Sequence, residues 1–236
     1  MLFIKQLKEK AAYMNLSVDD HQAALMSRHW QLVNSANNKF NLTAINEQKT
    51  AIIKHYIDSL LVEPLLPQEG KVVDIGSGAG YPGIPLAIMR PSAQFLLLDS
   101  SKKRCGFLEQ VKNQLELNNV SVLCSRAETM ARDPHLRGTI SVVIARAVSS
   151  LPVLLEYALP FLAPKGIFLA MKGPNLQEEL TNSSNALSVL GAKTELIKKY
   201  ILPDTEETRY VAVIRKTDYC PDKCPRRAGK PEKHPL

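Results

Sequence analysis

Apolar residues follow two different periods along the chain. In the first 65 residues they recur every three or four positions, as on one face of an amphipathic helix. This pattern predicts a helix starting at residue 2, a second after possible N-cap residues at 17–20, and a third over about 47–60. Residues 34–46 are polar and rich in asparagine, which indicates a loop. Residues 1–65 are therefore expected to form a helical cap.

After residue 70, short apolar runs alternate with helical patterns. The predicted strands are 72–75, 95–98, 120–124, 140–145 and 167–171, and the predicted helices between them are 84–89, 101–117 and 151–162. Strands that alternate with helices in this way are typical of a parallel sheet covered by helices on both faces. The fold class predicted from the pattern is therefore α/β.

The last part of the chain breaks this alternation. Residues 176–190 have a helical pattern, but 193–201 and 209–215 have strand patterns with no helix between them. Two consecutive strands favour an antiparallel pair that closes the edge of the sheet. Residues 66–216 are thus expected to form one sheet domain. The tail, residues 217–236, contains four prolines and is not expected to form regular structure alone.

The composition is that of a globular chain, with 236 residues of which 45% are hydrophobic. No apolar run approaches the roughly 20 residues that a membrane-spanning helix needs. The N-terminus lacks the regions of a signal peptide, so we expect a cytoplasmic protein. Cys220 and Cys224 could hold a metal, but a structural zinc site needs four ligands and only His234 is near in sequence. We therefore expect no metal site.

Charge is unevenly distributed along the chain. The net charge is +7, and residues 215–236 carry seven lysines and arginines against three acids, which is 7 − 3 = +4. A basic segment on a nearly balanced body indicates a polyanionic partner. The alternative is a solvated, disordered tail that improves solubility.

A glycine-rich segment follows the strand predicted at 72–75. Asp74 precedes three alternating glycines, Gly76, Gly78 and Gly80, and a helix follows them. Strand, glycine turn and helix form the layout of a nucleotide-binding loop. Asp99 ends the next strand, 23 residues after Gly76, where a carboxylate can accept both hydroxyls of an adenosine ribose. This combination resembles class I S-adenosylmethionine-dependent methyltransferases, and the alternative is a dinucleotide-binding Rossmann domain.

Further motifs sharpen the resemblance. In order along the chain they are 38–43, 55–59, 74–85, 98–104, 126–128, 145–147, 171–173 and, in the tail, 224–231. Together they resemble the RsmG (GidB) family, bacterial methyltransferases that methylate N7 of one guanine in 16S, or small-subunit, ribosomal RNA. The resemblance implies a Rossmann-like fold, S-adenosyl-L-methionine as cofactor, and ribosomal RNA or a ribosomal particle as partner. We expect a monomer without membrane association.

The resemblance also implies roles for single residues. The implied cofactor-binding residues are Asp74, Gly76, Gly78, Gly80 and Tyr81 at the methionine end, Asp99 at the ribose, Ala127 and Glu128 at the adenine, and Arg146 where the cofactor and substrate sites meet. For two of them a structural role without a ligand is the alternative: Asp99 could cap the next helix, and Glu128 could be a solvated loop acid. Arg146 directly follows an apolar strand, where an arginine needs an acidic partner or a ligand.

The expected RNA contacts are basic residues near the strand ends and in the tail. They are Lys102, Arg104, Lys172, Arg226 and Arg227, with Arg28, Lys39, Lys54 and Lys103 as further candidates. Contacts of this kind bind phosphates without choosing a sequence. For any one lysine the alternative is a solvated helix face.

The chemistry that the resemblance implies needs no general base. Guanine N7 carries an available lone pair, so no proton must leave before the methyl transfer. We therefore assign no catalytic role to His55 and expect Arg146 to act by orientation and electrostatics. Two other functions are compatible with the sequence: a non-catalytic nucleotide- or RNA-binding ribosome assembly factor, and a small-molecule methyltransferase.

Overall fold

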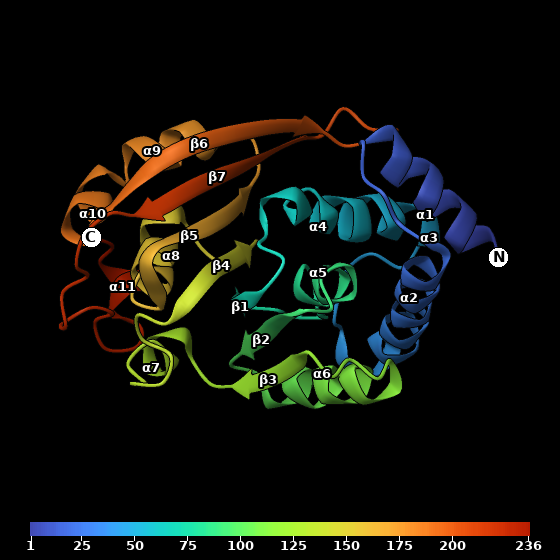
Figure 1. Ribbon diagram of the computed structural model, residues 1–236, viewed down its shortest axis with the longest axis horizontal. Helices are drawn as coiled ribbons and strands as arrows, with labels where there is room; N and C mark the ends of the chain where they lie inside the picture. The colour runs from blue at the N-terminus through green and yellow to red at the C-terminus, as the bar shows by residue number, and fades with distance from the viewer.

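A seven-stranded sheet forms the centre of the computed structural model (Figure 1). The structure describes residues 1–236, except for the side chains of residues 38–40. The strand order is β3-β2-β1-β4-β5-β7-β6. The strands are β1 Gly70–Ile75, β2 Ala93–Asp99, β3 Val120–Cys124, β4 Ile140–Arg146, β5 Leu162–Lys172, β6 Ala192–Ile201 and β7 Thr208–Lys216.

The sheet is parallel from β3 to β5 and antiparallel beyond it. β7 runs antiparallel to both β5 and β6, which confirms the predicted closing pair. The strand order reverses beside β1: the chain passes outward through β2 and β3, and then returns to place β4 on the other side of β1. In open α/β sheets a ligand crevice forms at the carboxyl ends of the strands at such a reversal.

The N-terminal segment is helical, as predicted. Its helices are α1 Leu2–Tyr13, α2 Asp20–Phe40, α3 Gln48–Ala51, a π-helical turn Ile52–Ile57, α4 Asp58–Leu60 and a 3₁₀ turn Glu63–Leu65. Asp19 caps α2 by accepting the Gln22 backbone N–H at 2.7 Å. The Gln22 side chain accepts the Asp19 N–H in return, so both groups of a capping box are satisfied.

The loop predicted over residues 34–46 is wrong in its first half, because α2 continues to Phe40. Asn37 explains why asparagines do not end this helix. Its side chain donates to the Thr43 carbonyl and to Asn46 Oδ1, and accepts the Thr43 N–H. The amide therefore ties the following turn to the helix instead of competing with the helix backbone.

The helical cap and the sheet share one hydrophobic core. Phe3, Trp30 and Tyr56 of the cap belong to the same buried cluster as Val72 and Phe95 of the sheet. The first 65 residues therefore differ from the rest in secondary structure, but they do not bury a core of their own.

The remaining helices cover the two faces of the sheet. α5 Gly83–Met89 and α6 Lys102–Gln114 pack on the same face as the cap, and α7 Ala127–Met130, α8 Leu151–Ala158, α9 Leu176–Thr181 and α10 Ser184–Val189 pack on the other. The single helix predicted at 176–190 is thus two helices. Among the described residues, no helix is long and apolar enough to cross a membrane.

The tail is docked on the body, which makes the alternative of a solvated, disordered tail wrong. Cys220 and Cys224 are buried in the same hydrophobic cluster as the residues of α8. The Arg137 guanidinium donates to the backbone carbonyls of both cysteines, at 3.2 and 2.7 Å. Burial raises the pKa of the Cys220 thiol to about 11. A short helix, α11 Lys230–Lys233, lies beside α8 (Figure 1).

Candidate active site

The glycine loop between β1 and α5 requires glycine for steric reasons. Gly76 has a φ of +73°, and a Cβ atom there would lie 2.5 Å from Val148 Cγ2. Gly83, in the first turn of α5, has no such φ, but its Cβ would lie 2.2 Å from Leu97 Cδ2. The first glycine lets the chain turn away from the strand, and the second lets α5 pack closely on β2.

The carboxylates of Asp74 and Asp99 hold this loop by accepting hydrogen bonds from its backbone N–H groups. Asp74 Oδ2 accepts the Gly83 N–H at 3.0 Å, whereas Asp74 Oδ1 is buried and has no partner among the described residues. Burial raises the pKa of Asp74 to about 6. Asp99 Oδ2 accepts the Gly78 N–H at 3.0 Å, and its Oδ1 accepts the Ser101 N–H at 2.8 Å. Asp99 therefore joins the loop to Ser101, the N-cap residue of α6, but it does not cap the helix, and neither contact excludes a ligand role.

Two cavities meet at the loop. One, of about 330 Å³, is lined by Asp99, Ala127, Glu128, Val148, Tyr157 and Glu232, among others. The other, of about 500 Å³, extends from the loop to the cap and β7. Gly76 and Arg104 border both cavities. We call the first the nucleoside cavity and the second the cationic cavity.

Glu128 is not the solvated loop acid of the alternative interpretation. It is 5% exposed, in the first turn of α7, and its Oε1 accepts the Gly229 N–H at 3.1 Å. The glutamate thus connects the wall of the nucleoside cavity to the tail. Ala127, beside it, is also buried.

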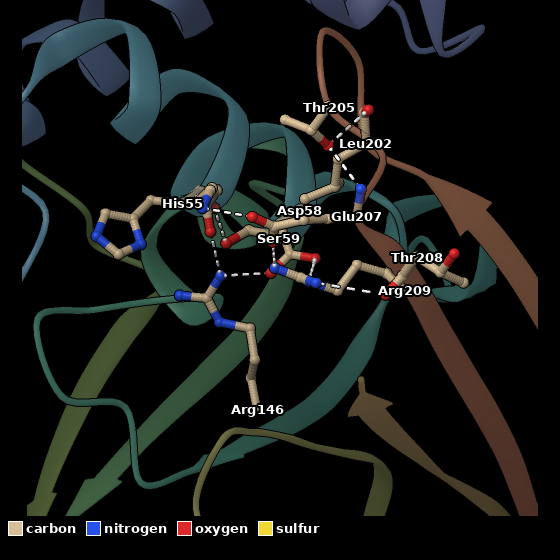
Figure 2. A network of polar contacts seen from close by, with 10 residues as sticks. His55, Asp58, Ser59, Arg146, Leu202, Thr205, Glu207, Thr208 and Arg209 are labelled. Carbon is tan, nitrogen blue, oxygen red and sulfur yellow. Dashed lines mark hydrogen bonds and ion pairs between the residues drawn. The ribbon is translucent and has the colours of Figure 1, made fainter. Parts of the chain in front are cut away.

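Arg146, at the end of β4, is held in the cationic cavity by Asp58. Its Nη1 donates to Asp58 Oδ2 at 2.8 Å and to the Lys54 carbonyl at 2.9 Å. Arg209 of β7 approaches the same carboxylate, with its Nε 3.5 Å from Asp58 Oδ1. Figure 2 shows the two arginines reaching Asp58 from different strands. A single buried carboxylate therefore fixes two guanidinium groups.

The described side chains give the cationic cavity an excess of positive charge. Asp58 is the one acid on its wall among them, against the basic residues Lys54, Arg104, Arg146, Lys172 and Arg209. Glu207, outside the lining, pairs with Lys54 at 2.5 Å and with Arg209 at 2.6 Å. These two cations lower the pKa of the Glu207 carboxyl. A wall of this kind suits an anionic ligand such as an RNA phosphate.

A buried chain of aromatic side chains supports the loop from the cap side, and of its members only Tyr81 was expected at the site from the sequence. His29 Nε2 lies 2.9 Å from the Ala79 carbonyl, so this nitrogen carries the proton. Nδ1 can then accept the Tyr56 hydroxyl at 3.1 Å, and the Tyr81 hydroxyl donates to Tyr56 at 3.0 Å. Burial lowers the pKa of His29 to about 4, which keeps the imidazole neutral.

His55 lies on the other side of Tyr81. The two rings stack with centroids 4.3 Å apart, and His55 Nε2 lies 2.8 Å from Thr43 Oγ1. Burial and, less strongly, the charge of Arg146 lower the pKa of His55 to about 3. An imidazole with so low a pKa is a poor proton acceptor at neutral pH, which agrees with our decision to give His55 no catalytic role.

Comparison with known proteins identifies the family. The family model described as rRNA small subunit methyltransferase G (GidB) matches residues 22–207. A protein of Acetivibrio thermocellus named Ribosomal RNA small subunit methyltransferase G is 43% identical over 98% of this chain and 96% of its own length. A protein of the same name from Desulfitobacterium hafniense is 44% identical over 94% of this chain and 93% of its own length.

This chain belongs to the rRNA small subunit methyltransferase G family. The part that the family model matches contains the glycine loop, Asp99, Glu128, Arg146 and most of the helical cap. It ends before β7 and the tail, although the two relatives align with nearly the whole chain.

Solved structures agree on the fold. M. jannaschii TYW2, whose crystal structure is a complex with AdoMet, has a TM-score of 0.55 and 17% identity, over 68% of this chain and 75% of its own. At this identity the likeness concerns the fold alone. It supports the assignment of this chain to the class I methyltransferase fold and not to a dinucleotide-binding domain.

The basic residues expected to contact RNA fall into two groups. Lys102 and Arg227 are exposed, and Arg104 lies 3.5 Å from Asp99 with a side chain that is 47% exposed. Lys172 is instead bound to Glu179 at 2.7 Å, and Arg226 is bound to the buried Glu156 at 2.6 Å. The side chain of Lys39 lies outside the described residues.

Proposed function

We propose that this chain transfers the methyl group of S-adenosyl-L-methionine to N7 of a guanine in 16S ribosomal RNA. The observation that carries the proposal is the meeting of the nucleoside cavity and the cationic cavity at Gly76. A methyl donor in the first would lie beside an RNA nucleotide in the second. The curated relatives bear a name that describes methylation of small-subunit ribosomal RNA.

The residues at the crevice fit this cofactor. Asp99 uses one hydrogen bond on each oxygen for the loop and α6, and each oxygen can accept another from a ribose hydroxyl. Ala127 and Glu128 would flank the adenine. The close backbone of Gly76 suits the polar methionine end, and Gly78 and Tyr81 on the wall of the cationic cavity would complete that side of the site. Asp74 and Gly80 line neither cavity, and the buried Asp74 would act by holding the glycine loop through the Gly83 N–H.

The bound cofactor supplies an electrophilic methyl group on a sulfonium. The protein needs to hold guanine N7 in line with that methyl group, because the N7 lone pair requires no prior loss of a proton. We infer that Arg146 is the catalytic residue that orients the base. Asp58 balances the charge of Arg146, so that the guanidinium does not oppose the positive charge developing on the methylated base.

The proposal extends to the setting in which the protein acts. Ribosomal RNA is a cytoplasmic partner, so we propose that the protein acts in the cytoplasm, and we propose that it acts as a monomer. Residues 1–65 and 66–216 would act as one catalytic unit around their shared core. Lys102, Arg104 and Arg227 are the expected RNA contacts that face solvent.

A substitution at Arg146 tests the proposed mechanism. The purified protein is incubated with cofactor labelled at the methyl group and with unmethylated small ribosomal subunits or their RNA. We expect Arg146→Ala to lower kcat by about 100-fold, as for loss of one transition-state contact. Arg215→Ala is the matched control, since Arg215 lies at the far end of β7 in an ion pair with Glu195. Equal rates for both variants would overturn the role of Arg146.

A further inference from the structure

A third hollow lies on the tail, outside the crevice. It has a volume of about 560 Å³ and a wall made mainly by the C-terminal residues. We call it the tail hollow. Its lining consists of Arg132, Lys223, Arg226, Arg227, Ala228, Gly229, Lys230, Lys233 and His234. None of these described residues is acidic.

The cations of the tail hollow are largely uncompensated. Arg226 is neutralised by Glu156, whose carboxylate is fully buried. Arg227, Lys230 and Lys233 are exposed, and none of the ion pairs between described residues includes them. Like charges crowded around one hollow repel one another, and a polyanion bound there would remove that repulsion.

Side-chain hydrogen bonds hold the backbone around the tail hollow on the body of the protein. Arg132 Nη2 donates to the Pro225 carbonyl at 2.5 Å. Arg226 donates from its Nη2 to Glu156 at 2.6 Å and to the His234 carbonyl at 2.7 Å. These contacts hold the chain on both sides of α11, so the exposed cations lie together around the hollow while the tail is docked.

The same segment also forms part of the nucleoside cavity. The Gly229 N–H donates to Glu128, and Glu232 accepts the Tyr157 hydroxyl at 3.3 Å. Glu232 lines the nucleoside cavity, whereas Lys230 and Lys233 line the tail hollow. One short segment, α11, therefore contributes its acidic residue to the nucleoside cavity and its basic residues to the tail hollow.

We propose that the tail hollow binds backbone phosphates of the RNA and that this binding strengthens cofactor binding in the nucleoside cavity. The proposal rests on the proposed function for the identity of the polyanion. Both ligands need the tail in its docked position, so each favours the state that the other binds. Thermodynamic linkage then requires the two effects to be equal.

The RNA part is tested by the salt dependence of binding. The probe is unmethylated small-subunit ribosomal RNA, and the variant is Lys230→Gln with Lys233→Gln. Each phosphate contact contributes about 0.7 to 0.9 to the slope of log affinity against log salt, so the slope should become shallower by roughly 1.5. The control pair is Lys71→Gln with Lys193→Gln, two exposed lysines at the amino-terminal ends of β1 and β6, whereas the crevice lies at the carboxyl ends of the strands. A slope change no larger than that of the control pair would overturn the site.

The coupling is tested by calorimetry with the reaction product S-adenosylhomocysteine. Saturating RNA should tighten its binding to the unsubstituted protein by about fivefold or more, the lower end of typical coupling. The Lys230/Lys233 double variant should lose most of this gain. Equal affinity with and without RNA, or an undiminished gain in the double variant, would overturn the coupling.

The proposed function is tested separately in the same preparation, by methylation of the RNA by the unsubstituted protein. Failure of that reaction overturns the function. Normal methylation together with an unchanged salt slope overturns only the tail hollow as an RNA site.

Discussion

Asp58→Asn changes the charge at the centre of the cationic cavity while it keeps the size of the side chain. The carboxylate is 6% exposed and contacts Arg146 Nη1 at 2.8 Å and Arg209 Nε at 3.5 Å. An asparagine can still accept one hydrogen bond but cannot neutralise either guanidinium. The two arginines would then repel each other, and Arg146 would lose its fixed orientation.

The structure sets the size of the effect. A hydrogen bond to a charged group contributes about 1.5–3 kcal/mol, and Arg146 is only 15% exposed, so water compensates little. Loss of that orientation in the transition state should lower kcat/KM for RNA by about 10- to 150-fold. The free energy of unfolding should fall by about 2 kcal/mol, less than for a fully unpaired buried charge, because the asparagine retains an acceptor.

The assay is steady-state methyl transfer to unmethylated small-subunit RNA, with urea unfolding measured in parallel. Binding of S-adenosylhomocysteine should change little, since Asp58 does not line the nucleoside cavity. Asp20→Asn is the matched control, because Asp20 is 86% exposed and pairs with Lys8. If Asp58→Asn keeps kcat/KM within about twofold of the control, Arg146 does not depend on Asp58 and the reasoning is refuted.

Three further substitutions test the glycine loop, the buried imidazole of His29 and the docking of the tail. Gly76→Ala should weaken S-adenosylhomocysteine binding at least tenfold in calorimetry, because its Cβ would lie 2.5 Å from Val148 Cγ2; unchanged affinity would contradict the loop assignment. The pKa of His29 is about 4 in the folded protein and 6.5 for an ordinary histidine, so the unfolded chain binds a proton at a higher pH than the folded protein does. As the pH falls from 6.5 to 4, the free energy of unfolding should therefore drop by about 3 kcal/mol. His29→Asn should flatten that part of the urea-unfolding profile, and an unaltered profile would argue against a buried neutral imidazole. Arg226→Ala should cost about 3 kcal/mol of unfolding free energy, because the buried Glu156 loses its cationic partner and keeps only the backbone N–H of residue 226, whereas Arg227→Ala should cost little; equal losses would contradict tail docking through this pair.

The sheet and the loop could be predicted from the sequence because their signals are local. β3 has the predicted bounds, Val120–Cys124, since a short apolar run between polar residues has few other uses. Asp99 was found at a strand end because the spacing from Gly76 is fixed by one strand–helix–strand unit. In each case neighbouring residues determine the structure.

The missed features depend on distant residues. The docked tail relies on Arg226 and Glu156, which are 70 positions apart in sequence. His29 is on an amphipathic helix like many histidines, and only its contact with the Ala79 carbonyl, 50 positions away, shows that it supports the loop. A single sequence does not encode such pairings in any local pattern.

The central claim is that the chain methylates guanine N7 in 16S ribosomal RNA, and the product of the reaction tests it most directly. The RNA is recovered after reaction with methyl-labelled cofactor, digested to nucleosides and separated by mass spectrometry. The label should appear in 7-methylguanosine from one position of the RNA, and Arg146→Ala should reduce it sharply. Label in another nucleoside, or none in the RNA of either naked or assembled subunits, would contradict the central claim.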